Sequence, residues 1–229
     1  MAIVKKYKAE VVSIVNYFEN IYTVELASKS GILKFLPGQF LHFALDEYDP
    51  CSNWPDSRCF SIQSAPGATL LKITFSAKGF FTNRMTKELF VGKIIDIKLP
   101  FGELFQQDYN KVNVVFIAGG TGVTPYLSEF TSQNFDIYVK PKLYLGLREN
   151  RFNIYQKELN LAKQINASLE INVIYQSEKG ILNIQDIFQQ NGLDCTYFIS
   201  GPQLMISNFR AELISNGVLE NNIRTDDWE

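Results

Sequence analysis

The stretch VVFIAGGTGVTPYLSEF, residues 114–130, decides the fold of the second half of this sequence. Its apolar start predicts a buried strand that ends at Ala118, and a helix is expected to begin near Pro125, because proline suits a first helical turn. The glycines between them allow a tight turn and a close approach to a phosphate. The segment lacks the G-x-G-x-x-G fingerprint and the P-loop lysine. It therefore indicates either an anion-binding loop or a tight turn without a ligand.

The residues around this stretch repeat its strand-then-helix pattern. Alternation of this kind predicts a parallel sheet of βαβ units. The expected strands are compact apolar runs that look buried on both faces, at residues 112–118, 142–147, 169–175 and 195–200. The expected helices lie near residues 125–132, 153–164, 184–190 and 203–215.

The first half of the chain has a different sequence pattern. Short runs rich in β-branched and aromatic residues alternate with turn residues, and one helical pattern interrupts them around Phe81–Leu89. Such runs predict a small antiparallel barrel. The expected strands are residues 8–15, 21–27, 39–45, 59–64, 70–77 and 93–99. We place the boundary in the polar segment Gln106–Lys111, which gives domains 1–106 and 107–229.

Composition excludes several classes of protein. The chain has 229 residues and a mass of 26.2 kDa. Its 46% apolar and 20% charged residues argue against a disordered protein. Its net charge of −2 argues against a nucleic-acid-binding protein. Three cysteines and one histidine are too few for a structural zinc site or an iron–sulfur cluster, so redox chemistry requires an organic cofactor. We expect no metal, no signal peptide and no membrane span, and hence a cytoplasmic protein.

Two shorter motifs lie in the first half. Arg58-Cys59-Phe60-Ser61 opens a predicted strand, where the arginine suits a phosphate and Phe60 offers a ring on the same face. KGFFTN, residues 78–83, precedes the helix with a glycine and a threonine. Each motif is also compatible with a purely structural role, the first as an ordinary strand and the second as a helix cap by Thr82.

The order of these motifs resembles the ferredoxin–NADP reductase superfamily along nearly the whole chain. That resemblance implies a flavin-binding antiparallel β-barrel followed by a nucleotide-binding parallel-sheet domain. The matching pieces are PGQF at 37–40, RCFSIQSAP at 58–66, KGFFTN at 78–83, LPFGE at 99–103, AGGTGVTP at 118–125, ISGPQLM at 199–205 and IRTDDW at 223–228.

The resemblance implies roles for individual residues of the first domain. Arg58 is expected to hold a flavin phosphate, with Cys59 in the same segment, and Ser61 to act catalytically near flavin N5. Phe60 stands where the family usually has tyrosine, which keeps the ring for packing on the flavin and loses one hydroxyl contact. The residues expected to bind the FAD pyrophosphate are Gly79, Phe81, Thr82 and Asn83.

The same resemblance assigns the nicotinamide nucleotide to the second domain. Ser200 replaces the family's catalytic cysteine beside the nicotinamide, and Trp228 is a candidate cover for the flavin. The residues expected to bind NADH or NADPH are Gly119, Gly120, Thr121, Gly122, Pro125, Arg148, Gly201 and Pro202. Residues 174–177 lack the arginine of NADP-dependent relatives, which favours NADH, although Arg148, Arg151 and Lys179 lie nearby.

We therefore predict an FAD-dependent NAD(P)H oxidoreductase that passes electrons to a separate acceptor protein, such as a ferredoxin, an oxygenase component or a haem protein. Two alternatives remain open: a reductase of freely diffusing flavin, and a non-catalytic flavin-binding sensor or interaction subunit. His42 and Cys195 are expected to be structural residues, and Asp226-Asp227 a solvated turn.

Overall fold

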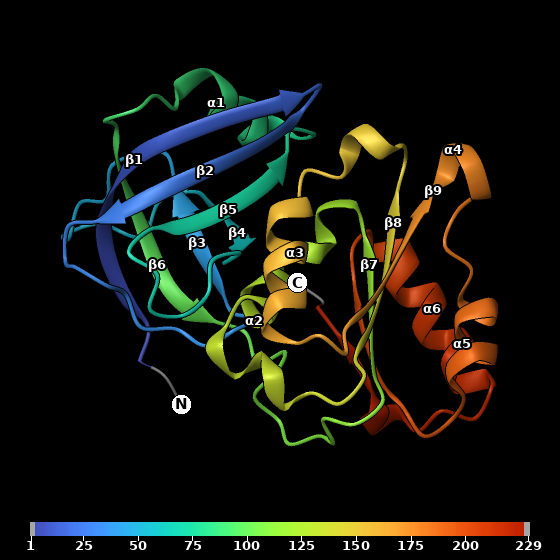
Figure 1. Ribbon diagram of the computed structural model, residues 1–229. Helices are drawn as coiled ribbons and strands as arrows, with labels where there is room; N and C mark the ends of the chain where they lie inside the picture. The colour runs from blue at the N-terminus through green and yellow to red at the C-terminus, as the bar shows by residue number, and fades with distance from the viewer. Residues whose placement is uncertain (1–2, 227–229) are drawn as a thin grey trace. The chain divides into compact units, whose positions relative to one another are not determined.

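The computed structural model describes residues 3–226 of the chain. Its residues cluster into two compact units, Met1–Glu103 and Leu104–Glu229 (Figure 1). The first unit holds the antiparallel strands and the second holds the parallel ones. The predicted fold class is thereby confirmed.

The first unit is a six-stranded antiparallel sheet in the order β4-β3-β6-β1-β2-β5. Alternate residues of each strand face one hydrophobic core, as Ala9 and Val11 of β1 do with fully buried side chains. Helix α1 adds Phe81 and Met85 to that core. The elements are β1 (Lys5–Phe18), β2 (Ile21–Ser28), β3 (Phe40–Ala44), β4 (Ser57–Ser61), β5 (Leu71–Ser76), α1 (Phe80–Glu88) and β6 (Ile94–Phe101).

The second unit is a five-stranded parallel sheet in the order β11-β10-β7-β8-β9. Figure 1 shows α2 and α3 on one face of this sheet and α5 and α6 on the other. The strands are β7 (Val114–Gly119), β8 (Lys142–Leu147), β9 (Glu170–Tyr175), β10 (Thr196–Ser200) and β11 (Ile223–Thr225). The helices are η1 (Gly120–Val123), α2 (Thr124–Phe130), η2 (Gln133–Ile137), η3 (Asn150–Phe152), α3 (Gln156–Ile165), α4 (Gln176–Lys179), α5 (Ile184–Asn191), α6 (Gln203–Ser215) and η4 (Glu220–Asn222).

The central strand β7 is buried on both faces, as its apolar run predicts. Val115 and Ile117 face α5 and α6, whereas Phe116 packs against Tyr126 and Phe130 of α2, at ring-centroid distances of 5.3 and 4.9 Å. The carboxyl end of this strand leads directly into the glycine loop. A rigid, close-packed strand therefore fixes the start of that loop.

Two features differ from the sequence predictions. The run at 169–175 was expected to be buried on both faces, but Glu170 and Asn172 of β9 are exposed because β9 is the edge strand of its sheet. The short strand β11 was not predicted, because three residues carry too little periodicity to be recognised. Within residues 3–226, no helix is long and apolar enough to cross a membrane.

Candidate functional site

The predicted flavin motifs of the first unit lie side by side. The guanidinium of Arg58, on β4, lies 5.2 Å from the ring centroid of Phe81, in the first turn of α1. No acidic residue occurs in that turn. An arginine beside the free N–H groups of a helix start is a donor set suited to a phosphate. Arg58 also pairs with the exposed carboxylate of Asp56, at 2.6 Å.

The start of α1 is organised by Thr82. Its hydroxyl accepts the N–H groups of Lys78 and Gly79, at 3.0 and 3.1 Å. Gly79 faces open space where a side chain would stand. Phe81 is 2% exposed, so only its backbone is available to a ligand, and Asn83 is exposed. Thr82 is therefore not the residue that caps the free N–H groups of α1: the helix begins at Phe80 after Gly79, and the Thr82 hydroxyl instead holds the two residues that precede the helix.

The other residues of the β4 motif divide between the two faces of the strand. Phe60 shares a face with Arg58 and is half-buried, its ring edge-on to Phe43 at a centroid distance of 6.0 Å. Cys59 points to the opposite face, where its Sγ lies 3.6 Å from Nε2 of His42. Burial raises the pKa of the Cys59 thiol, and burial and then Lys98 lower the pKa of His42. Ser61 ends the strand, paired with Phe40 of β3.

In the second unit, the glycine loop packs directly on the Ser200-Gly201-Pro202 motif. A Cβ added to Gly122 would lie 2.6 Å from Cα and N of Gly201, and one added to Gly119 would lie 2.9 Å from Pro202 Cδ. These glycines allow two loops of the sheet to touch. Gly120 differs, because it has a φ of +57° and open space at its Cβ position.

The glycine loop forms a 3-10 turn, and helix α2 begins directly after it. Residues Gly120–Val123 form a 3-10 turn, and α2 starts at Thr124, whose hydroxyl donates to the carbonyl of Thr121 at 2.9 Å. Pro125 lies in the first turn of α2, as predicted, and is buried. Thr121 is half-buried, as are the three glycines of the loop.

Ser200 has a partner that the sequence analysis missed. It is 2% exposed at the end of β10, and its hydroxyl donates to Oδ2 of Asp226 at 3.1 Å. The pairing of β11 with β10, continued by a bond from Asp226 N–H to the Ile199 carbonyl at 3.0 Å, brings the carboxylate there. Asp226 is 9% exposed, so the expectation of a solvated turn is wrong for this residue. A strand predicted at residues 223–225 would have placed Asp226 beside Ser200.

The remaining nucleotide residues lie beyond β8 and β9. Arg148 is exposed, and its carbonyl accepts the N–H of Ser177 at 3.0 Å, which joins the two segments weighed for nucleotide choice. Arg151 pairs with Glu149 at 3.0 Å, and Lys179 is exposed on α4. Asp227 and Trp228 lie outside the described residues, so their roles stay predictions.

A buried polar cluster in the second unit was not anticipated. Tyr138 donates to Glu129 at 2.7 Å and is hydrogen-bonded to Tyr109, and Lys111 donates to Tyr138 at 3.4 Å. Burial raises the pKa of Glu129, and it lowers the pKa of Lys111 to about 8, against the nearby carboxylates of Glu129 and Asp108. Among residues 3–226, no group of acidic, histidine and cysteine side chains is arranged to hold a metal ion.

Proteins of known structure share this architecture. No protein-family model matches the chain. It is 23% identical over 215 residues to a flavohemoprotein of Candida norvegensis, an alignment that covers 91% of this chain and 54% of the relative. The structure superimposes on an Amycolatopsis cytochrome P450 reductase with a TM-score of 0.82, at 15% identity and with coverage of 98% of this chain and 70% of the other. It superimposes on ferredoxin-NADP+ reductase of Plasmodium falciparum with a TM-score of 0.76, at 17% identity and with coverage of 96% and 95%.

The chain has the fold of the ferredoxin–NADP reductase superfamily. The resemblance stated from the motifs is thereby confirmed. The superfamily fold accounts for both units, the antiparallel one and the parallel one. The chain spans about half the length of the flavohemoprotein that it matches.

Proposed function

We propose that the chain is an FAD-dependent NAD(P)H oxidoreductase that delivers electrons to a separate acceptor protein. The observation that carries this proposal is the meeting of Arg58 with the first turn of α1, at 5.2 Å from the Phe81 ring. Twenty-two residues lie between Arg58 and Phe81 in the sequence, and their proximity in the fold supports a shared phosphate site. In this proposal, residues 1–106 bind FAD and residues 107–229 bind NAD(P)H.

The residues of the first unit suit a flavin nucleotide. Arg58 and the free N–H groups at the start of α1 would hold its phosphates, and Gly79 leaves room for them. Phe60 presents a half-buried ring on the same face as Arg58. Ser61 would donate a hydrogen bond from its hydroxyl to the flavin ring system. A bound flavin supplies the chemistry of accepting a hydride and releasing electrons.

The residues of the second unit suit a nicotinamide nucleotide. Gly120 offers an unobstructed backbone, and the packing of Gly122 on Gly201 holds the loop rigid. Ser200 is oriented by Asp226, so its hydroxyl has one fixed direction. These residues position the nucleotide, and no general base is required for hydride transfer.

The choice of nucleotide and acceptor extends the proposal. We favour NADH, because residues 174–177 contain no arginine to meet a 2′-phosphate. Arg148 is exposed and has no ion pair among the described residues, so it is a residue to mutate first if NADPH is preferred. The names of the relatives, a flavohemoprotein and a cytochrome P450 reductase, support a haem protein as the acceptor. Steady-state kcat/KM for both nucleotides tests the first point, and a preference for NADPH above about tenfold, or ~1.4 kcal/mol, contradicts it.

The decisive experiment begins with the colour of the purified protein. We expect a yellow protein that releases FAD on denaturation and reduces ferricyanide with NADH. Release of FMN, or no flavin after attempted reconstitution, contradicts the proposal. A colourless protein that reduces added flavin with NADH would be a free-flavin reductase, and a yellow protein without turnover would be a sensor.

Ser61 gives a second test within the same site. Ser61→Ala is expected to keep the flavin bound and to slow its reduction by NADH, because only a hydroxyl contact is removed. Rapid mixing measures that rate, and Ser30→Ala, at an exposed turn position after β2, serves as the control. Equal reduction rates for the wild type and Ser61→Ala would remove Ser61 from the mechanism.

A further inference from the structure

The thioether of Met205 lies against both of the loops that meet at the carboxyl end of the parallel sheet. Met205 belongs to the first turn of α6, and its N–H donates to the Pro202 carbonyl at 2.8 Å. Its sulfur lies 2.9 Å from the position that a Cβ of Gly119 would occupy, and its methyl carbon lies 2.9 Å from the corresponding position at Gly201. One flexible apolar side chain therefore fills the space over both glycines.

These two glycines belong to segments that hold the ends of β7 and β10 together. Gly119 ends β7, Gly201 follows β10, and the two strands pair in parallel. A Cβ added to Gly201 would also stand 3.0 Å from the Gly119 nitrogen, so backbone meets backbone beside the thioether. Neither segment can shift without moving a strand of the close-packed sheet. The glycine contact therefore depends on a side chain that fits it without strain.

Met205 is the methionine that is placed for oxidation. It is half-buried, beside the exposed residues 202–204. The chain has three methionines, of which Met85 is fully buried in the core of the first unit and Met1 lies outside the described residues. A thioether that solvent reaches is open to oxidants, whereas a fully buried one is protected. Among the described residues, oxidation of methionine is therefore directed to the nucleotide loops.

We propose that Met205 is an oxidation switch of these loops, with hydrogen peroxide as the oxidant. The sulfur attacks one peroxide oxygen and the O–O bond breaks. The hydrogen on the transferred oxygen passes to the leaving hydroxide, which departs as water, so the sulfur is oxidised to the sulfoxide as the peroxide is reduced. A sulfoxide oxygen directed toward the glycines meets backbone, and one directed toward water draws the polar side chain away from them. Either movement loosens the contact between Gly119 and Gly201.

The consequence is weaker nucleotide binding, and this consequence rests on the proposed function. In that proposal, the backbone of the glycine loop and of Gly201 holds the nucleotide, and Met205 acts through these glycines as a positioning residue. Methionine sulfoxide reductases convert the sulfoxide back to the thioether, so the switch is reversible. An oxidised chain would accept electrons from NADH more slowly, and electron delivery would fall while peroxide is present.

Calorimetric titration with ADP-ribose, before and after peroxide treatment of the flavin-loaded chain, tests the proposal without turnover. Peptide mass spectrometry locates the added oxygen. We expect oxidation of Met205 to weaken ADP-ribose binding at least tenfold, and methionine sulfoxide reductases to restore it, while circular dichroism stays unchanged. Met205→Leu keeps all three cysteines, so peroxide should leave its own ADP-ribose affinity unaltered. Equal losses in Met205→Leu and the wild type would overturn the proposal.

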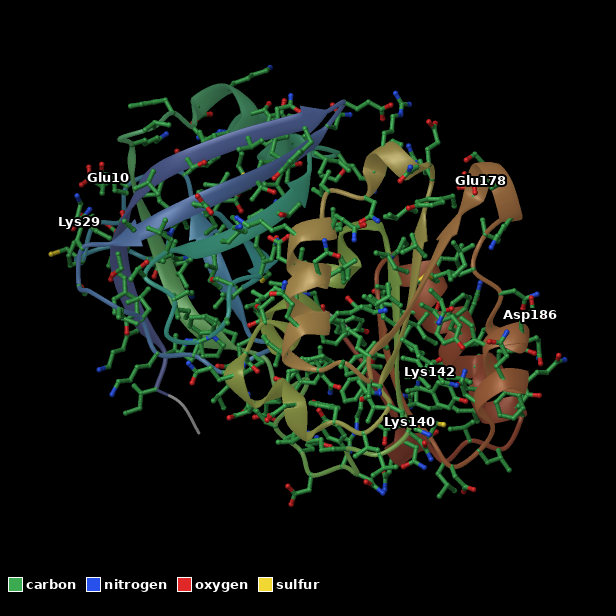
Figure 2. All side chains as sticks on the ribbon, viewed as in Figure 1. Glu10, Lys29, Lys140, Lys142, Glu178 and Asp186 are labelled. Carbon is green, nitrogen blue, oxygen red and sulfur yellow. The ribbon has the colours of Figure 1, made fainter. Side chains whose placement is uncertain are left out.

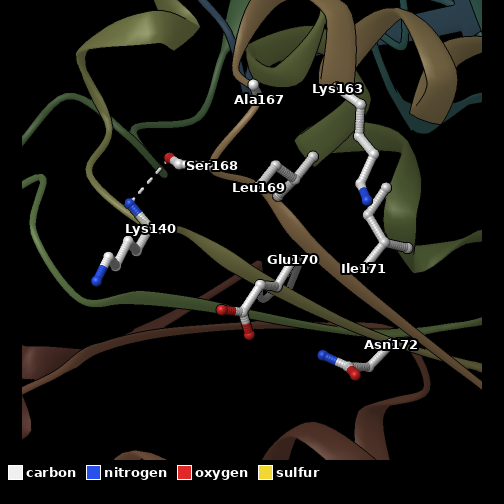
Figure 3. A pocket seen from close by; sticks show the side chains of 8 residues that line it. All are labelled: Lys140, Lys163, Ala167, Ser168, Leu169, Glu170, Ile171 and Asn172. Carbon is white, nitrogen blue, oxygen red and sulfur yellow. Dashed lines mark hydrogen bonds between the residues drawn. The ribbon is translucent and has the colours of Figure 1, made fainter.

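A methionine at the other end of the sheet is the matched control. Figure 2 labels both ends, since Lys142 opens β8 at its amino end and Glu178 follows the carboxyl end of β9 on α4. Ala167 is exposed and lines a pocket at the amino end (Figure 3). Met205→Leu combined with Ala167→Met moves the oxidisable thioether there without a change of charge. Peroxide should oxidise this methionine and leave ADP-ribose affinity unaltered.

The outcomes separate this inference from the proposed function. If the untreated wild type binds ADP-ribose, but peroxide leaves Met205 unmodified or its oxidation leaves the affinity unchanged, only the switch is overturned. If the untreated wild type binds no ADP-ribose, the proposed function is contradicted and the switch with it. If Met205→Leu proves unfolded, the reductases decide on the wild type, because they repair methionine sulfoxide and not oxidised thiols. An affinity that they fail to restore then overturns the proposal.

Discussion

The two units offer a ligand different kinds of groups. In the first unit, the candidate site presents an exposed side chain, Arg58, beside the start of a helix. In the second unit, the glycine loop presents backbone, because Gly122 and Gly201 pack so closely that no side chain fits between them. A side-chain site can be altered without loss of the fold, whereas a backbone site is part of the fold. The predictions at Gly122 and Arg58 test that difference, and those at Ser200 and Lys111 extend it to buried side chains of the second unit.

The largest effect is expected at Gly122. The Cβ of Gly122→Ala would stand 2.6 Å from backbone atoms of Gly201, which cannot move aside as a flexible side chain does. Overpacking of this kind costs about 3 kcal/mol of the free energy of unfolding. Urea denaturation measures it. Gly120→Ala, with open space at a φ of +57°, is the control and should cost about 1 kcal/mol. Equal losses for the two variants would show that close packing does not fix this loop.

The next effect belongs to Arg58. Arg58→Ala is expected to weaken FAD binding by about ten- to a hundredfold, since a charge-assisted hydrogen bond contributes roughly 1.5–3 kcal/mol. The melting temperature of the flavin-free protein should stay within experimental error, because the Arg58–Asp56 pair is exposed. Titration with FAD measures the affinity.

Arg151 is a matched control for Arg58 in the second unit. It also pairs with a carboxylate two residues earlier, and it lies 5.3 Å from the ring of Phe152, where Arg58 lies 5.2 Å from Phe81. Arg151→Ala should leave FAD affinity unchanged. If both variants weaken FAD binding alike, the effect of Arg58 is one of general charge.

A smaller effect is expected at Ser200. Ser200→Ala leaves the buried Asp226 carboxylate without this donor, which should lower the free energy of unfolding by about 1 kcal/mol. The variant should also slow flavin reduction by NADH, because the hydroxyl direction is lost. Ser215→Ala, which removes a surface hydroxyl from α6, should do neither. A slower reduction with unchanged stability would assign Ser200 a role that is independent of its packing.

The smallest effect is a pH dependence in the second unit. Burial lowers the pKa of Lys111 to about 8 in the folded chain, below its value of 10.5 in the unfolded chain. Between these values the unfolded state binds more protons at this group, so Lys111 contributes a rise in the free energy of unfolding as pH increases from 8 to 10. Lys111→Met should lose this rise, whereas Lys34→Met, at an exposed position of the first unit, should keep it. Thermal melts at several pH values measure the slope.

Much of the architecture could be predicted from local pattern. Runs of alternating apolar and polar residues, bounded by turn residues such as glycine, predicted the strands of the first unit. In the second unit, residues 142–147 and 203–215 form a strand and a helix with the predicted bounds. The edge position of β9 was not predictable, because an apolar run does not reveal how many neighbours a strand will have. Strand order depends on contacts between distant residues, which leave no local signal.

For the candidate site, the sequence by itself determined the residue types: the glycine loop, the arginine of β4 and the threonine in the first turn of α1. These follow from local rules, because turns and caps depend on neighbouring residues. Only the tertiary structure decided which of them meet. It placed Arg58 beside α1, packed Gly122 on Gly201 and brought Asp226 to Ser200 through a strand of three residues. The physical reason is that burial and strand pairing act between segments far apart in the chain, and they turn a terminal aspartate into a buried hydrogen-bond acceptor.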